Sequence, residues 1–292
     1  MKPLITSPLT IAALFRAAEP ILGGVADWHS GDDIEKGVQQ DAAAQTYANY
    51  RALVSEMREI EATCAWSADE INAWLAARKF DIALEPFSPQ TFGMAAVSDF
   101  SVQWPEVAGL ERIRRPDGST HEGFRLKSDW LQCDDDPGDT TTLWVRTKTN
   151  DVIGIAMAPR PDSERELLKE VRNRMSVPAR SRHPSPAMAD LPMVDLDAKL
   201  DLSYLVGMWT KMPDRKFPDI ITQALGQAMF RMNEKGARAR VAMAAAVTRS
   251  FSMPRVIAFN KPFLLWIERP GVNVPLFAAY LEPDCWKKPT DL

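Results

Sequence analysis

Cysteine is scarce in this 292-residue chain. The three that are present, Cys64, Cys133 and Cys285, are far apart in sequence and odd in number. Such spacing indicates neither a disulfide framework nor a metal knuckle. Because proteins without disulfides are typical of reducing compartments, we expect a cytoplasmic protein.

Histidine is equally rare, and the three histidines lie in turn-rich segments without the spacing of metal ligands: His29, His121 and His183. No Gly-x-Ser-x-Gly segment and no cysteine–histidine arrangement of nucleophilic catalysis is present. The acidic run at residues 134–136 lacks the alternating ligands and distal glutamate of an EF-hand, which favours a solvated turn over a calcium site. We therefore expect no catalytic residue, no cofactor and no metal, and we do not expect an enzyme.

Long apolar runs are also missing, since no stretch approaches the roughly 18 residues that a membrane-spanning helix needs. Residues 4–15 faintly resemble a signal peptide, but Pro8 and Arg16 interrupt its apolar centre, so secretion is the less favoured alternative. A net charge of −4 and a pI near 5.6 argue against a nucleic-acid partner. With 46% hydrophobic and 25% charged residues, the composition is that of a globular protein.

The most informative segment is near the C-terminal end, where the turn Asn233-Glu234-Lys235-Gly236 precedes a run of small residues. Every second residue of that run is apolar: Ala237, Ala239, Val241, Met243 and Ala245. This alternation predicts a strand with one buried face, because successive side chains of a strand point to opposite sides. A slip of one residue would bury Arg238 and Arg240. An alanine-rich amphipathic helix is the alternative.

Together with the later segment Phe259-Asn260-Lys261-Pro262-Phe263 and two apolar runs at 263–267 and 274–280, this pattern resembles the reactive-centre loop and C-terminal signature of serpins. The resemblance implies a single α+β domain over residues 1–292, in a shortened, divergent, bacterial-type member. It implies a large central mixed sheet, further sheets packed behind it, surrounding helices and an exposed reactive-centre loop at about 237–253. The two apolar runs are expected to form an antiparallel hairpin across the turn at 270–273.

Earlier segments extend the resemblance. Residues 6–14 resemble the family's second helix, residues 71–76 the helix across the main sheet, and residues 91–104 a long strand that ends at Trp104. The pattern also predicts helices at residues 8–18, 41–63 and 162–175. Ser67 and Glu70 have the spacing of a capping box.

Several positions depart from the family. The resemblance places Ser7 and Trp104 in the region that controls sheet opening. In the polar cluster of that region, Ala96 and Gly226 stand where an asparagine and a histidine are expected. The hinge glutamate is present as Glu234, whereas its usual lysine partner is replaced by Met193. These changes affect the expected opening of the sheet more than the fold, because such a conformational switch depends on a small energy difference between two packings.

The resemblance implies a monomeric suicide inhibitor of a serine-type protease, whose cut loop inserts into the central sheet. Arginine suits a trypsin-like pocket, so Arg249–Ser250 is the expected scissile bond, with Phe251–Ser252 as the alternative. The hinge is expected to comprise Glu234, Gly236, Ala237, Ala239, Val241 and Met243. The competing hypothesis is a serpin-like binding protein, or a simple protease substrate, that does not inhibit.

Overall fold

The computed structural model describes residues 4–134, 142–177, 182–184, 187–214, 216–237 and 256–290. The chain divides into two compact units. Unit 1 comprises Met1–Thr6, Phe100–Asp197 and Met229–Leu292, and unit 2 comprises Ser7–Asp99 and Ala198–Ala228. We describe each unit by itself, and the single domain expected from the sequence stays a prediction.

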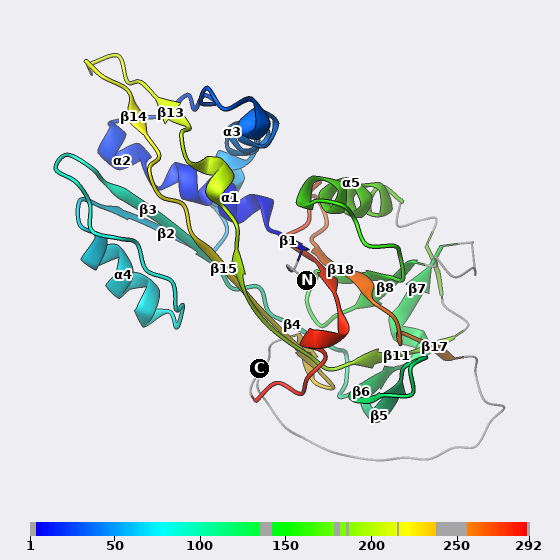
Figure 1. The fold of residues 1–292 in the computed structure, drawn as a ribbon. Helices are drawn as coiled ribbons and strands as arrows, with labels where there is room; N and C mark the ends of the chain where they lie inside the picture. The colour runs from blue at the N-terminus through cyan, green and yellow to red at the C-terminus, as the bar shows by residue number, and fades with distance from the viewer. Residues whose placement is uncertain are drawn as a thin grey trace. The chain divides into compact units, whose positions relative to one another are not determined.

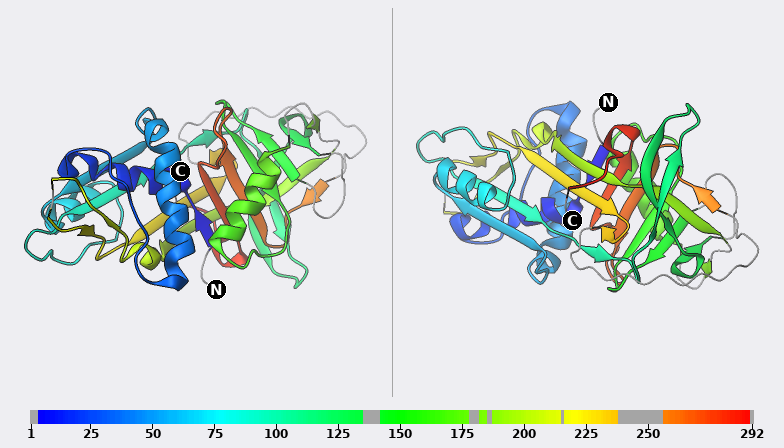
Figure 2. Two further views of the ribbon diagram at one scale, coloured as in Figure 1. Left: turned by 90° about the horizontal axis from the view of Figure 1, so that it is seen from above. Right: turned by 90° about the horizontal axis from the view of Figure 1, so that it is seen from below.

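Unit 1 is built on a seven-stranded sheet (Figure 1). Its order is β1 (Leu4–Thr6), β19 (Phe277–Leu281), β18 (Phe263–Glu268), β9 (Val152–Ala156), β8 (Thr142–Arg146), β7 (Leu131–Cys133) and β10 (His183–Pro184). The green helix α5 (Glu164–Met175) lies over β1, β18 and β19 (Figure 2). Leu167 and Val171, one turn apart, bury that face of the helix against the strands.

The predicted C-terminal hairpin is confirmed. β18 and β19 are antiparallel neighbours, with Phe263 opposite Leu281 and Ile267 opposite Phe277. The second strand begins at Phe277 rather than at residue 274. Gly271, in the connecting turn, has a φ of +85°, a conformation that glycine adopts without steric cost.

Two four-stranded sheets contain further strands of unit 1. One has the order β17 (Val256–Ala258), β11 (Met188–Pro192), β6 (Thr120–Leu126) and β5 (Gly109–Arg114). The other has the order β12 (Val194–Leu200), β15 (Gly226–Asn233), β16 (Gly236–Ala237) and β4 (Val102–Gln103). Two strands of this second sheet, β12 and β15, are divided between the units. Since β17 is parallel to β11 while β6 is antiparallel to it, the first sheet is mixed.

Unit 2 packs helices against a two-stranded sheet of β2 (Ile60–Ala65) and β3 (Gly93–Ser98). One face of β3 packs against α4 (Ala68–Ala77), through Ala95 and Val97. The remaining elements are α1 (Pro8–Arg16), α2 (Glu19–Leu22), α3 (Ile34–Val54), the 3₁₀ turn Ser203–Leu205, β13 (Trp209–Thr210) and β14 (Asp219–Ile220). Proline at the first position of α1 is tolerated because its missing N–H would lack a helical partner.

The helix predicted at residues 41–63 is wrong at both ends. α3 begins earlier, at Ile34, because the Asp33 carboxylate caps it by accepting a hydrogen bond from the Glu35 amide at 3.1 Å. It ends at Val54, and residues 60–63 belong to β2. Local helix propensity misses this strand because pairing with β3 decides its conformation.

Two smaller expectations also need correction. The strand predicted at residues 91–104 is interrupted, since β3 ends at Ser98 and β4 begins at Val102. Ser67 does occupy the N-cap of α4, with extended backbone angles, but its side chain makes no cap hydrogen bond. The helix predicted at residues 162–175 is confirmed as α5, and the α+β class is confirmed for the fold as a whole.

A buried ion pair at the end of β18 gives the first testable prediction. Arg182 pairs with Glu268, and their side chains are only 9% and 10% exposed. Glu268 also accepts a hydrogen bond from the Trp266 indole at 3.1 Å. We expect Glu268→Ala to lower the free energy of unfolding by about 3–5 kcal/mol, because Arg182 is left buried without its partner. Urea unfolding measures the change.

The matched control is Glu166→Ala on α5, which removes a pair with Lys169 whose side chains are 47% and 67% exposed. Exposed pairs contribute little, so this variant should stay within about 1 kcal/mol of the unchanged protein. Equal losses in the two variants would contradict the assignment of the Arg182–Glu268 pair as a stabilising buried contact.

Candidate functional site

The first part of the predicted hinge, residues 234–237, lies in a tight hairpin between β15 and β16. Met232 is opposite Ala237 and Asn233 is opposite Gly236, so Glu234 and Lys235 form the connecting turn. The Asn233 side chain accepts a hydrogen bond from the Lys235 amide at 2.8 Å, as asparagine commonly does two residues before the amide that it binds. The turn is therefore stabilised by its own sequence.

β16 lies between two strands. On one side it pairs with β15, and on the other Gly236 is opposite Gln103 and Ala237 is opposite Val102 in β4. Ala237 is 2% exposed. The first residue of the alternating apolar series thus faces a packed interior, within a sheet rather than at its edge.

Gly236 is required at this point. A Cβ atom there would lie 2.4 Å from the Val102 carbonyl oxygen and 2.9 Å from the Gln103 Cα. The residue also has a φ of +155°, which side-chain-bearing residues rarely adopt. Only glycine lets the hinge backbone lie this close to β4.

Trp104 anchors the hinge turn. Its indole Nε1 donates to the Asn233 carbonyl oxygen at 2.9 Å, and its amide donates to the Lys235 carbonyl oxygen at 3.4 Å. The Ala108 amide donates to the Glu234 carbonyl oxygen at 2.7 Å. Because Trp104 is 1% exposed, it supplies both a core side chain and hydrogen-bond donors for the turn.

Glu234 has no ion pair among the residues that the structure describes. Met193, at the position of its expected lysine partner, is 1% exposed and belongs to the apolar core. The turn is thus held through its backbone, by Trp104 and Ala108, rather than through the charge of Glu234.

The segment after the predicted loop is fixed in another sheet. β17 pairs in parallel with β11, and the Phe259 amide donates to the Asp190 carbonyl oxygen at 2.8 Å. The Asp190 carboxylate in turn accepts two hydrogen bonds from Arg125, at 2.6 and 2.8 Å. This bidentate pair raises the pKa of Arg125 above its usual value.

The architecture resembles solved serpins. The serpin of Schistosoma mansoni matches with a TM-score of 0.62 at 11% identity, over 96% of this chain and 95% of its own. Serpin48 of the insect Tenebrio molitor matches with a TM-score of 0.57 at 13% identity, over 96% of this chain and 92% of its own. Thyroxine-binding globulin in complex with thyroxine matches with a TM-score of 0.58 at 14% identity, over 96% of this chain and 92% of its own. The protein has the serpin fold.

At these identities the likeness shows the fold alone, and the bacterial type stays a prediction. No protein-family model matches the sequence, and no curated protein matches it. Over the part of the chain that the structure describes, none of the helices has the length and apolar character needed to cross a membrane.

Ser7, expected in the polar cluster that controls sheet opening in a serpin fold, lies in unit 2. Its hydroxyl is 2.8 Å from the Thr10 hydroxyl, which donates to the Ser98 hydroxyl at 2.9 Å. Ala96, where an asparagine was expected, is opposite Ala62 in the β2–β3 ladder. The polar contacts of Ser7 therefore run to Thr10 and on to the end of β3.

Gly226, where a histidine was expected, also lies in unit 2. A Cβ atom on it would be 3.0 Å from atoms of both Leu200 and Leu202. The leucine side chains therefore fill the space that a larger residue at this position would need. An apolar contact stands where the serpin resemblance predicted a hydrogen-bonding histidine.

The other predicted loop and hinge residues lie outside the described residues: Ala239, Val241, Met243, Arg249, Ser250, Phe251 and Ser252. Sequence reasoning missed Gln103, Ala108 and Asn233 as hinge contacts. Asn233 alone carried a local signal, because asparagine before a short polar turn often bonds the backbone within it. Gln103 and Ala108 contribute only backbone groups, which no sequence pattern marks.

Replacing Gly236 tests this geometry. We expect Gly236→Ala to lower the free energy of unfolding by about 1–3 kcal/mol, because the added methyl group collides with β4 and the backbone angle becomes strained. Thermal unfolding measures the loss. Gly109→Ala is the control, since a Cβ atom there has nothing within 4 Å. If Gly236→Ala proved as stable as the control, the close approach would be wrong.

Proposed function

We propose that this serpin-fold protein inhibits a serine-type protease by offering a loop as substrate and then inserting the cut loop into a sheet. The protease attacks the loop and forms its acyl-enzyme, and insertion traps it in that state. In this proposal the protein is a substrate and a trap rather than an enzyme. It needs no cofactor and no metal.

One observation carries the proposal. Gly236 and Ala237 already form a strand between β15 and β4, with Ala237 buried. A strand that begins inside a sheet provides the register for the residues that follow it, because side chains alternate between the two faces. On insertion, Ala239, Val241 and Met243 would share the inward parity of Ala237, and none of them carries a charge.

The fixed ends of the loop support the same mechanism. The chain leaves one sheet at β16 and returns in another at β17. A cut between these strands would leave each new end attached to its own sheet, so the first part could extend β16 while β17 stays in place. We propose Arg249–Ser250 as the scissile bond and a trypsin-like target, with Phe251–Ser252 as the alternative.

A second function is favoured by specific positions. Met193, Ala96 and Gly226 replace the lysine, asparagine and histidine that the resemblance predicts. One structural neighbour, thyroxine-binding globulin, is in complex with thyroxine. The alternative is a serpin-fold binding protein, or a protease substrate, without inhibition. Action as a monomer in the cytoplasm, without nucleic acid or membrane, is part of the proposal under either function.

Thermal unfolding before and after nicking distinguishes the two functions. If the cut loop inserts, it adds strand hydrogen bonds and buries apolar side chains, so the nicked protein should gain at least about 10 °C in Tm. The protein is cleaved in the loop by a limiting amount of trypsin and then scanned. An unchanged or lower Tm would favour the non-inhibitory alternative.

A pair of neighbouring substitutions tests the inserting face. Ala239→Asp should be cleaved by trypsin but should form no complex that survives SDS, because insertion would bury the new charge. Arg240→Asp is the matched control, since residue 240 has the opposite parity and its side chain would stay in solvent on insertion. This control should trap trypsin as the unchanged protein does.

The outcomes are separable. Trapping by Ala239→Asp would show that the inserting parity is wrong, while no trapping by any variant, including the unchanged protein, would argue against inhibition of trypsin-like proteases. Mass spectrometry of the released C-terminal fragment locates the cut. A fragment that begins at Ser250 is expected, and one that begins at Ser252 would remove Arg249 from the mechanism.

A further inference from the structure

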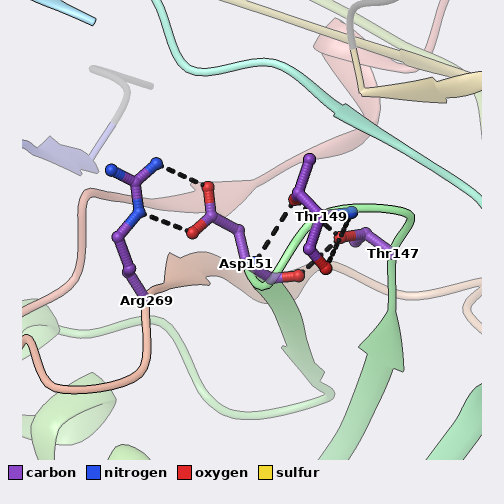
Figure 3. Close-up of polar contacts among 4 residues, drawn as sticks. All are labelled: Thr147, Thr149, Asp151 and Arg269. Atoms are coloured by element: carbon purple, nitrogen blue, oxygen red, sulfur yellow. Dashed lines mark hydrogen bonds and ion pairs between the residues drawn. The ribbon is translucent and has the colours of Figure 1, made fainter. Parts of the chain in front are cut away.

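The turn between β8 and β9 is unusually well bonded (Figure 3). The Thr147 hydroxyl donates to the Asp151 carbonyl oxygen at 2.6 Å and accepts from the Thr149 amide at 3.2 Å. The Thr149 hydroxyl accepts from the Asp151 amide, also at 3.2 Å. Two threonine side chains thus satisfy the backbone of the turn and hold its shape.

A bidentate ion pair ties this turn to the C-terminal hairpin. Arg269, the residue after β18, donates from Nε and Nη2 to the two carboxylate oxygens of Asp151 at 2.7 and 2.8 Å (Figure 3). The Asp151 side chain is 8% exposed and that of Arg269 is 28% exposed. A carboxylate this buried depends on its partner, and the two-point geometry fixes the orientation as well as the distance.

The same turn contacts β4. The Lys148 amide donates to the Gln103 carbonyl oxygen at 2.9 Å. Gln103 is the β4 residue opposite Gly236, while its neighbour Trp104 donates its amide to the hinge at Lys235. Successive residues of a strand direct their backbone groups to opposite edges, so the β8–β9 turn borders β4 on the edge away from the hinge.

We propose that Arg269 and Asp151 are positioning residues for the hinge. By fixing the β8–β9 turn, they hold β4 from its outer edge and keep open the space that β16 occupies between β4 and β15. Without the pair, Lys148 no longer holds Gln103, β4 can shift towards β15, and the hinge strand loses its place. The consequence for trapping a protease rests on the proposed function, whereas the consequence for hinge pairing does not.

Amide hydrogen exchange tests the hinge directly, with no protease present. In Arg269→Ala, the Lys148, Trp104 and Ala108 amides should exchange about tenfold faster or more, because each donates to a bond that this turn or the hinge provides. Ile155 in β9, paired with Leu265, serves as the internal reference for global opening. The ratio of each amide to this reference is the measured quantity.

Arg160→Ala is the matched control. Arg160 pairs with Glu282 at 2.6 Å, with side chains 27% and 20% exposed, and belongs to the same unit. Removing it should leave the three ratios within about twofold of the unchanged protein, because the pair joins Arg160 to Glu282, beside Tyr280, and these residues belong to neither β4 nor the hinge turn. Equal acceleration in both variants would reduce Arg269 to a general stabilising residue and overturn the proposal.

Two further variants keep the test decisive if Arg269→Ala folds poorly. Arg269→Lys retains the charge but loses the bidentate geometry, so its ratios should fall between those of the unchanged protein and Arg269→Ala. Thr147→Val keeps the side-chain shape and removes the hydrogen bonds of the Thr147 hydroxyl within the turn. In this variant the exchange of the Lys148 amide should increase before that of Trp104 and Ala108. Unchanged ratios in both would overturn the proposal.

The effect on protease trapping is measured separately. The measured quantity is the number of molecules of this protein that trypsin cleaves for each SDS-stable complex formed. We expect this number to rise at least about twofold in Arg269→Ala and to stay unchanged in Arg160→Ala, because a misplaced β4 slows insertion. An unchanged number despite faster hinge exchange would overturn the link to trapping. Failure of the unchanged protein to trap trypsin would instead count against the proposed function and leave the exchange result standing.

Discussion

The close approach of Gly236 to the backbone of β4 is the contact on which the hinge depends. A single methyl group at this position would meet the Val102 carbonyl oxygen at 2.4 Å, so the hinge strand could not lie where it does. With glycine present, Ala237 enters the interior and Trp104 bonds to both sides of the turn. In the proposed inserted form, this first pair would set which of the following side chains enter the sheet, because side chains alternate along a strand.

At the positions where the serpin resemblance predicts polar switch residues, the protein has apolar ones. Met193 is buried where the serpin resemblance predicts a lysine, and Leu200 and Leu202 fill the space beside Gly226. Apolar cores tolerate such exchanges when volume is conserved, since a buried polar group without its partner costs more than a well-packed apolar one. The fold is therefore retained while the switch residues expected from the family are not, which is why inhibition and simple binding remain the two functions to separate by experiment.

The position of β4 gives the hinge a second dependence, on the C-terminal hairpin. Arg269 follows β18 and is linked to β4 through Asp151 and the threonine-bonded turn that carries Lys148. Each link is a short, directional hydrogen bond, and the carboxylate at its centre is almost fully buried. This series of hydrogen bonds acts by fixing the position of β4 rather than by electrostatic attraction at a distance, because directional bonds fix geometry while exposed charges are screened.

The sequence by itself determined the features that depend on local pattern: the hairpin of β18 and β19, the turn before Gly236, the burial of Ala237, and α5. Tertiary structure decided the rest. β2 is a strand because β3 pairs with it, and Gly236 is indispensable because Gln103, far away in sequence, lies opposite. Periodicity and turn chemistry act within a few residues, whereas pairing and close approach depend on segments that only the folded chain brings together.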